Sequence, residues 1–175
     1  MKVNSMEDLL IHELQDLYSA EKQLTKVLPR MAKVTTNPAL AELFRQHLEE
    51  TQTHVTRLED ILAELGAHTC STPCKAMEGL IAEADHLLGD VEDDSVRDAA
   101  IIGAAQRVEH YEIAGYGTAR TYAQLLGNLQ VAEMLQCTLD EEHATDVKLT
   151  TLAVGRINDA AERTDAFVRP EIHVD

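Results

Sequence analysis

The stretch LIHELQDLYSAEKQLTKVLPRM, residues 10–31, decides the fold. Apolar side chains recur in it at alternating steps of four and three residues, the pattern of a packed α-helix. They are Leu10, Leu14, Leu17, Leu24, Leu28 and Met31. Glu21 stands on the same stripe, where a helix bundle ordinarily places a leucine. Because a buried carboxylate without a partner is costly, the stripe predicts a compensating positive charge in the core.

The same arrangement occurs twice along the chain. Helices are predicted over 38–65, 95–126 and 128–161, and their stripes are interrupted by Glu50, Glu112 and Glu142. Glu21 and Glu50 are 29 residues apart, and Glu112 and Glu142 are 30 apart. His54 follows Glu50 by four residues, and Asp146 follows Glu142 by four. The spacing predicts two helical hairpins that resemble the product of a duplication.

The connection between the two hairpins is long. Residues 67–75 are typical of a loop, 76–88 predict a short amphipathic helix, and Gly89 with the acidic run 90–94 ends it. Such a connection can cross from one end of a bundle to the other, as ferritin-like topologies require. We therefore expect an all-α, up-down-down-up four-helix bundle over residues 1–161. Residues 162–175 lack periodicity and are expected to form a C-terminal tail.

Composition excludes several classes of function. The formal net charge of −16 argues against nucleic acid and against an anionic membrane surface as partners. No stretch approaches the apolar length of a membrane span, and Met1 to Asp8 lacks the apolar run of a secretory signal. Three cysteines do not make a disulfide framework, so a reducing cytoplasm is the expected compartment.

The polar interruptions predict a dinuclear metal site. Residues four apart share a helix face, so Glu50 with His54 and Glu142 with Asp146 are each able to bind one ion. Glu21 and Glu112 are expected to bridge or chelate, and carboxylates with imidazole suit iron or manganese. This set departs from the Glu-x-x-His spacing of di-iron bundles. Its five carboxylates also exceed the charge of two divalent ions by one, which predicts a retained proton, a nearby cation or a more oxidised pair.

Several neighbours of these ligands keep open alternatives. Glu109 is a seventh ligand, a hydrogen-bonding partner of a ligand or an exposed glutamate. His47 is interpreted as a supporting or core histidine, and Tyr18 and Tyr116 as packing residues or donors to ligand carboxylates. The loop with His68, Cys70 and Cys74 matches no four-ligand zinc site, and Cys137 receives no role. The alternative for the whole set is a buried polar network that fixes helix register.

Several segments resemble the bacterial YciE/YciF stress-protein family, closer to its YciF branch. They are YSAEKQL at 18–24, HLEET at 47–51, AMEGLI at 76–81, VEHYEIA at 108–114, TLDEE at 138–142 and ATD at 144–146. The resemblance reaches from the first helix to about Val154. It implies a ferritin-like bundle with a dinuclear metal centre, commonly a homodimer, and stress-linked expression without a settled activity. Carried over, the ligands are Glu21, Glu50, Glu112, Glu142 and Asp146, with Glu109 as a further candidate. Relatives often have Gln where this chain has His54.

The expected function is therefore a dinuclear metal protein of the stress response that reacts with O2 or peroxide. Iron is the first choice of metal and manganese the alternative, and whether the reaction is enzymatic is left open. A metal-stabilised structural dimer without catalytic activity is the second hypothesis. Iron storage in a cage is disfavoured because no fifth helix of the kind that cages use is evident, and buried carboxylates make a metal-free adaptor unattractive.

Overall fold

A computed structural model describes residues 2–69 and 72–168, and within these ranges the regular structure is helical. Helix α1 spans Met6–Val34, α2 spans Pro38–Glu64, α3 spans Lys75–Gly89, α4 spans Asp94–Leu125 and α5 spans Leu129–Leu152. A π-helical turn, Ala153–Ile157, joins α5 to α6, Asn158–Val168. No helix in the described ranges meets the length and apolarity of a membrane span.

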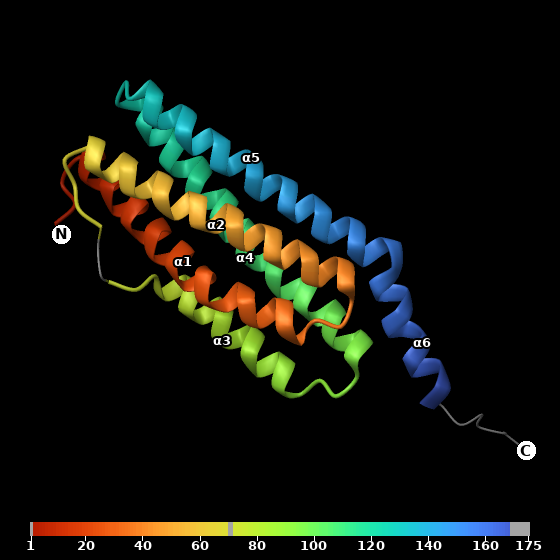
Figure 1. The fold of residues 1–175 in the computed structure, drawn as a ribbon. Helices are drawn as coiled ribbons and strands as arrows, with labels where there is room; N and C mark the ends of the chain where they lie inside the picture. The colour runs from red at the N-terminus through yellow and green to blue at the C-terminus, as the bar shows by residue number, and fades with distance from the viewer. Residues whose placement is uncertain (1, 70–71, 169–175) are drawn as a thin grey trace, which may run out of the picture.

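The four long helices form two antiparallel hairpins, α1 with α2 and α4 with α5 (Figure 1). Helix α3 lies along α1 and α4 in the crossover between the hairpins, so the expected all-α bundle with a long helical crossover is confirmed. At Gly115 of α4 an added Cβ would lie 2.7 Å from Leu17 Cδ2 of α1. The two helices therefore approach closely there.

Local sequence explains where the helices begin. Ser5 Oγ accepts a hydrogen bond from the Asp8 backbone N–H at 3.0 Å, and Asp8 Oδ2 accepts one from the Ser5 backbone N–H at 3.0 Å. This reciprocal pair is a capping box. Asn37 precedes Pro38, the first residue of α2, and caps that helix. Asp93 caps α4, one or two residues before the predicted Asp94 or Ser95.

The C-terminal part of the chain differs from the prediction. One helix was expected from Asn128 to Ala161, but α5 ends at Leu152 and the chain bends through the π-helical turn into α6 (Figure 1). Helix α6 then continues past Glu162 to Val168, where a tail was expected. Leu149, Ala153 and Ile157 are buried at steps of four residues, which a continuous helix also fits, so the periodicity did not reveal the bend. Residues 169–175 of the predicted tail, with His173, lie outside the described residues.

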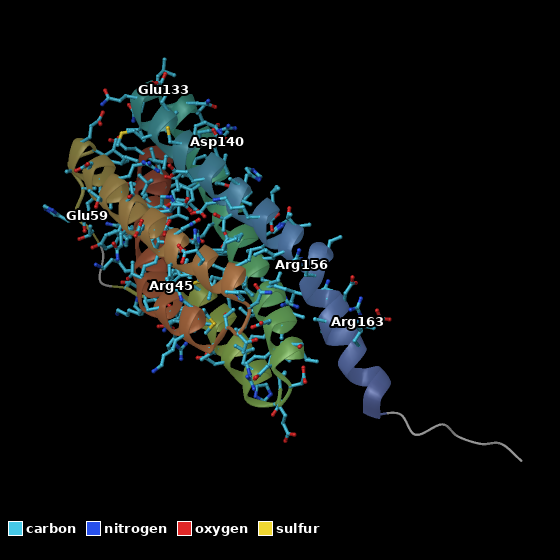
Figure 2. The ribbon with its side chains drawn as sticks, turned by 45° about the vertical axis from the view of Figure 1, so that its right-hand side comes forward. Arg45, Glu59, Glu133, Asp140, Arg156 and Arg163 are labelled. Carbon is cyan, nitrogen blue, oxygen red and sulfur yellow. The ribbon has the colours of Figure 1, made fainter. Side chains whose placement is uncertain are left out.

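The apolar core is divided into two parts along the bundle. One part includes Leu10, Leu14, Leu58, Ile61 and Leu135, and the other includes Leu24, Leu28, Leu40, Phe44 and Ile101. Charged side chains such as Glu133 and Asp140 lie on the outside of the bundle (Figure 2). The boundary between the two apolar parts falls at the level of Glu21, where the predicted polar interruptions lie.

Candidate metal centre

Six ionisable side chains from the four long helices are buried at this boundary. None is more than 2% exposed. They are Glu21 of α1, His47 and His54 of α2, Glu109 and Glu112 of α4, and Glu142 of α5. Each lies on the inward stripe of its helix, so the helix packing that buries the leucines also buries these groups.

The first group joins three helices around His54. The Nδ1 atom of His54 lies 3.2 Å from Glu21 Oε1 and 3.0 Å from Glu142 Oε1. One ligand atom from each of Glu21, His54 and Glu142 lies within 4.8 Å of the others, which is close enough to surround one ion. The hydroxyl of Tyr116 donates to Glu21 Oε1 at 2.5 Å. Tyr116 therefore has the donor role that was one of its two predicted alternatives.

The second group joins His47 to three carboxylates. His47 Nε2 lies 3.3 Å from Glu109 Oε1 and 3.9 Å from Glu142 Oε2. Ligand atoms of His47, Glu109, Glu112 and Glu142 also lie within 4.8 Å of one another. Glu142 belongs to both groups and turns one oxygen toward each, Oε1 to His54 and Oε2 to His47. A carboxylate in this position would offer one oxygen to an ion in each group.

The electrostatics of the cluster favour protons or metal ions. Burial raises the pKa of the Glu21, Glu112 and Glu142 carboxyls, and the neighbouring carboxylates raise the pKa of Glu112 further. Burial alone would lower the pKa of His54, but hydrogen bonds and charge from Glu142 and Glu21 outweigh it and raise the pKa to about 10. Burial would also lower the pKa of His47, but the charges of Glu109 and Glu142 outweigh this effect and raise it.

The buried carboxylates lack the hydrogen bonds that a structural network would supply. Both oxygens of Glu112, Oε2 of Glu142, and one oxygen each of Glu21 and Glu109 have no hydrogen-bond partner within the described residues, while Oε1 of Glu142 lies against the His54 ring. Asp98, also buried, shows the opposite case. Its carboxylate accepts from the Thr36 backbone N–H at 3.0 Å, the Thr36 hydroxyl at 2.8 Å and the Asn37 backbone N–H at 2.7 Å. Unpartnered oxygens beside two imidazoles fit hard divalent cations.

In each histidine, the ring nitrogen that faces away from the buried groups contacts the carboxylate of a half-exposed glutamate. His47 Nδ1 lies 3.4 Å from Glu50 Oε2, and His54 Nε2 lies 2.9 Å from Glu141 Oε2. Arg57 Nη1 donates to Glu141 Oε2 at 2.8 Å, and Lys148 Nζ lies 3.7 Å from Glu50 Oε1. Metal-ligating histidines are commonly held in this way, because a carboxylate on the outer nitrogen fixes the ring and its tautomer.

The structure brings five of the seven predicted ligands together: Glu21, His54, Glu109, Glu112 and Glu142. Glu109 is buried, so its exposed alternative is wrong. Glu50 lies on the outer side of His47 instead of in either group. Asp146 accepts a hydrogen bond from Gln106 Nε2 at 2.9 Å and lies 3.5 Å from His110 Nε2, also outside both groups.

Two residues of the centre were missed or given a lesser role. His47 was interpreted as a supporting histidine, yet its ring belongs to the group with three carboxylates. Glu141 received no role, although it holds His54. On α5 the buried residue after Glu142 is Thr145, three positions on, and Asp146 is rotated away by one residue. A stripe with alternating steps of three and four residues is compatible with either Thr145 or Asp146 on the inward face. The sequence pattern alone therefore did not decide between these two residues.

The remaining candidates lie elsewhere. Tyr18 donates to Glu59 Oε1 at 3.0 Å, away from Glu21. Cys74 is buried, caps α3 by accepting from the Met77 backbone N–H, and contacts the Tyr111 hydroxyl at 3.0 Å. Its role is thus to anchor the crossover helix between α1 and α4. Cys70 lies outside the described residues, and Cys137 is exposed.

Two hairpins joined by a crossover, with carboxylates and histidines at the middle of the bundle, define a ferritin-like fold. A ferritin-like, diiron-carboxylate protein from Bacillus anthracis has the same fold, with a TM-score of 0.68 at 16% identity over 86% of this chain and 99% of that one.

Closer relatives identify the family. The sequence profile of a domain of unknown function, DUF892, matches residues 5–162. Protein YciF of Escherichia coli is 48% identical over 163 residues, which cover 93% of this chain and 98% of YciF. The crystal structure of that stress protein superposes with a TM-score of 0.85 over 89% of this chain and 99% of YciF. YcfI from Rhodopseudomonas palustris, at 45% identity, gives 0.83 over 86% and 96% of the two chains. The chain belongs to the DUF892 family, which includes YciF.

Proposed function

We propose that this protein binds two metal ions between its four long helices, iron in the first place, and reacts with O2 or peroxide at that centre. The observation that supports this most strongly is Glu142, whose two oxygens face two different groups of ligands. Four glutamates and two histidines make up the groups, so two divalent ions would balance the four carboxylates. The excess negative charge expected from five carboxylates does not arise in this set, because Asp146 and Glu50 lie outside it.

The donor set also favours metal over a polar network. A network that fixes register would pair its members, as Asp98 is paired. Here no Lys or Arg in the described residues forms an ion pair with Glu21, Glu109, Glu112 or Glu142. When bound, two redox-active ions supply electrons and bind a small oxygen species.

The chain's own side chains would support that chemistry in three ways. Tyr116 holds a proton at Glu21 Oε1, where it orients that carboxylate. Glu50 and Glu141 fix the outer nitrogens of the two imidazoles. The apolar parts of the core above and below exclude water, which strengthens every electrostatic interaction in the centre.

Metal content tests this proposal directly. Protein purified without chelators and reloaded anaerobically with Fe(II) is expected to hold about two ions per chain, as carboxylate bundles of this kind do. Glu142→Ala removes the shared ligand and should abolish that stoichiometry. Glu133→Ala is the matched control, because Glu133 is an exposed glutamate of the same helix. Equal metal content in both variants, or no metal in the wild type after reloading, would refute a dinuclear centre.

A second candidate function is a metal-stabilised structural protein without catalysis. It is supported by the description of the relative YcfI, provisionally, as a structural protein. In that case metal would raise the melting temperature of the protein, but the reduced protein would consume neither O2 nor peroxide. YciF, by contrast, is a stress protein, which is in keeping with the oxidant chemistry. We also propose a cytoplasmic homodimer, which size-exclusion chromatography with light scattering would test.

A further inference from the structure

A cavity lies between α1, α3 and α4 and reaches the candidate metal centre. Its volume is about 50 Å³, measured as the space open to the centre of a water-sized sphere. The wall is made by aliphatic side chains and one aromatic ring, including Leu24, Phe44, Leu80, Ala84, Ile101 and Ala105. Its inner end is formed by His47 and Glu109, two members of the group with three carboxylates.

The cavity connects this buried end with the protein surface. Leu24, Phe44 and Ile101 are buried, whereas Leu80 and Ala84 of α3 are half-buried and Asp85 at the rim is exposed. Asp85 is paired with Arg30 of α1 at 3.1 Å, so the polar groups at the rim are directed at each other. The ring nitrogen Nε2 of His47 lies 3.3 Å from Glu109 Oε1, and Oε2 of Glu109 has no hydrogen-bond partner within the described part of the chain.

We propose that this cavity admits and holds O2 on its way to the His47–Glu109 side of the centre. The proposal rests on the proposed function and narrows its substrate from O2 or peroxide to O2. A single water needs about 10–15 Å³ by the same measure, so the space is larger than one water molecule.

The chemistry of the wall distinguishes O2 from peroxide. O2 forms no strong hydrogen bonds with water, so it gives up none when it enters an aliphatic cavity. Apolar cavities also stay dry and bind apolar atoms such as xenon. Peroxide has two O–H donors and would leave its hydrogen bonds unmade along the wall, which is costly. Polar partners for a small molecule occur at the inner end, at His47 and Glu109.

Small residues create the space. Ala84 of α3 and Ala105 of α4 line the cavity where larger aliphatic residues surround them. Ala105 is four residues before Glu109 and four after Ile101, so it lies on the helix face between the buried wall and the inner end. A leucine at 105 would occupy the passage next to the inner end, at a position that is not itself a proposed ligand.

Xenon binding tests the cavity without metal. Metal-free wild-type protein, examined by xenon NMR and by diffraction from xenon-pressurised crystals, is expected to bind the gas between α1, α3 and α4. Ala105→Leu should abolish this binding, and Ala84→Leu is a second variant in case the first is destabilised by overpacking. Ala82→Leu is the control, because Ala82 is an exposed residue of α3 outside the cavity wall. No xenon in the wild-type cavity, or equal binding in Ala105→Leu and the control, overturns the proposal.

Kinetics with anaerobically reduced, iron-loaded protein test the identity of the occupant. O2 consumption by Ala105→Leu is expected to be about tenfold slower than in the control, because the gas must displace a packed side chain. The reaction with hydrogen peroxide should be unchanged. Equal slowing of both reactions overturns the assignment to O2. If the protein binds xenon but consumes neither oxidant, the proposed function is refuted, and so is O2 as the occupant of the cavity. The cavity would then still be shown to bind gas.

Discussion

The metal-free protein is expected to lose stability as the pH rises from 6 to 9. Burial raises the pKa of Glu21, Glu112 and Glu142, so these carboxyls retain protons in the folded state that they lose in the unfolded chain. His54, with its pKa raised to about 10, and His47, also raised, keep protons in the folded state above pH 7. All five groups therefore bind protons more tightly in the folded state than in the unfolded chain, and the two histidines do so above neutral pH.

The sign and size of the effect follow from proton linkage. Since the native state binds more protons than the unfolded state, the free energy of unfolding falls as pH rises. Each additional bound proton changes it by about 1.4 kcal/mol per pH unit. If the two histidines alone differ between the states, the fall between pH 7 and 8 is about 2 kcal/mol, a large part of a typical domain's 5–15 kcal/mol. Glu50 and Glu141, whose pKa values are lowered, are ionised in both states over this range and add no slope.

Urea unfolding followed by circular dichroism, in chelator and at constant ionic strength, measures this slope. Saturation with Mn(II) should reverse it, because metal competes with the same protons and binds more tightly at higher pH. Constant or increasing stability of the metal-free protein between pH 6 and 8 would refute our account of the buried charges. The account would also be refuted if the free energy of unfolding of the metal-bound protein fell with pH in the same way.

Three further predictions follow from single positions. Glu112→Gln should raise the stability of the metal-free protein at pH 8 by about 1–2 kcal/mol and remove the metal-induced rise in melting temperature. The control Glu133→Gln should change neither quantity. Thermal unfolding with and without Mn(II) measures both. Glu141→Gln and Glu50→Gln should each weaken metal binding about 10–100-fold without abolishing it, measured by competition with a fluorescent chelator; complete loss would mean direct ligation. Asp98→Ala should cost about 2–4 kcal/mol in urea unfolding and leave metal content unchanged, and a lowered metal content would contradict its purely structural role.

The sequence predicted the elements of this fold because its signals were local. The leucine stripe around Glu21, the Asn37-Pro38 helix start and the glycines that end α2 and α4 depend only on neighbouring residues. Gly66 and Gly127 adopt φ values of 67° and 78°, which only glycine adopts readily. The bend into α6 was missed because the buried residues through the π-helical turn keep steps of four, which a continuous helix also fits.

The rotation of each helix could not be predicted in the same way. Deciding between Thr145 and Asp146, or between His47 and Glu50, needs the helix phase to within one residue, or 100°. That phase is set by packing between hairpins. The outer role of Glu141 depends in addition on Arg57, whose guanidinium approaches it from α2.

The repeated layout of the two hairpins resolves this ambiguity when the hairpins are aligned at a separation of 91 residues. Glu21 and Glu112 are 91 residues apart, and so are Asn37 and Asn128, which precede α2 and α5. At the same separation Glu50 corresponds to Glu141, not to Glu142. Both of these glutamates are half-exposed and hold the outer nitrogen of a histidine.

The same register pairs inward positions that differ in chemistry. Thr51 corresponds to Glu142, and His54 to Thr145, and all four side chains are buried. The two hairpins thus share a framework but not a ligand set, since α2 contributes both imidazoles and α5 the bridging carboxylate. In the proposed centre the two ions are therefore inequivalent: one faces Glu21, His54 and Glu142, the other His47 and three carboxylates. The apolar cavity reaches the second of these groups, so in the proposed centre O2 would arrive on the side of His47 and Glu109.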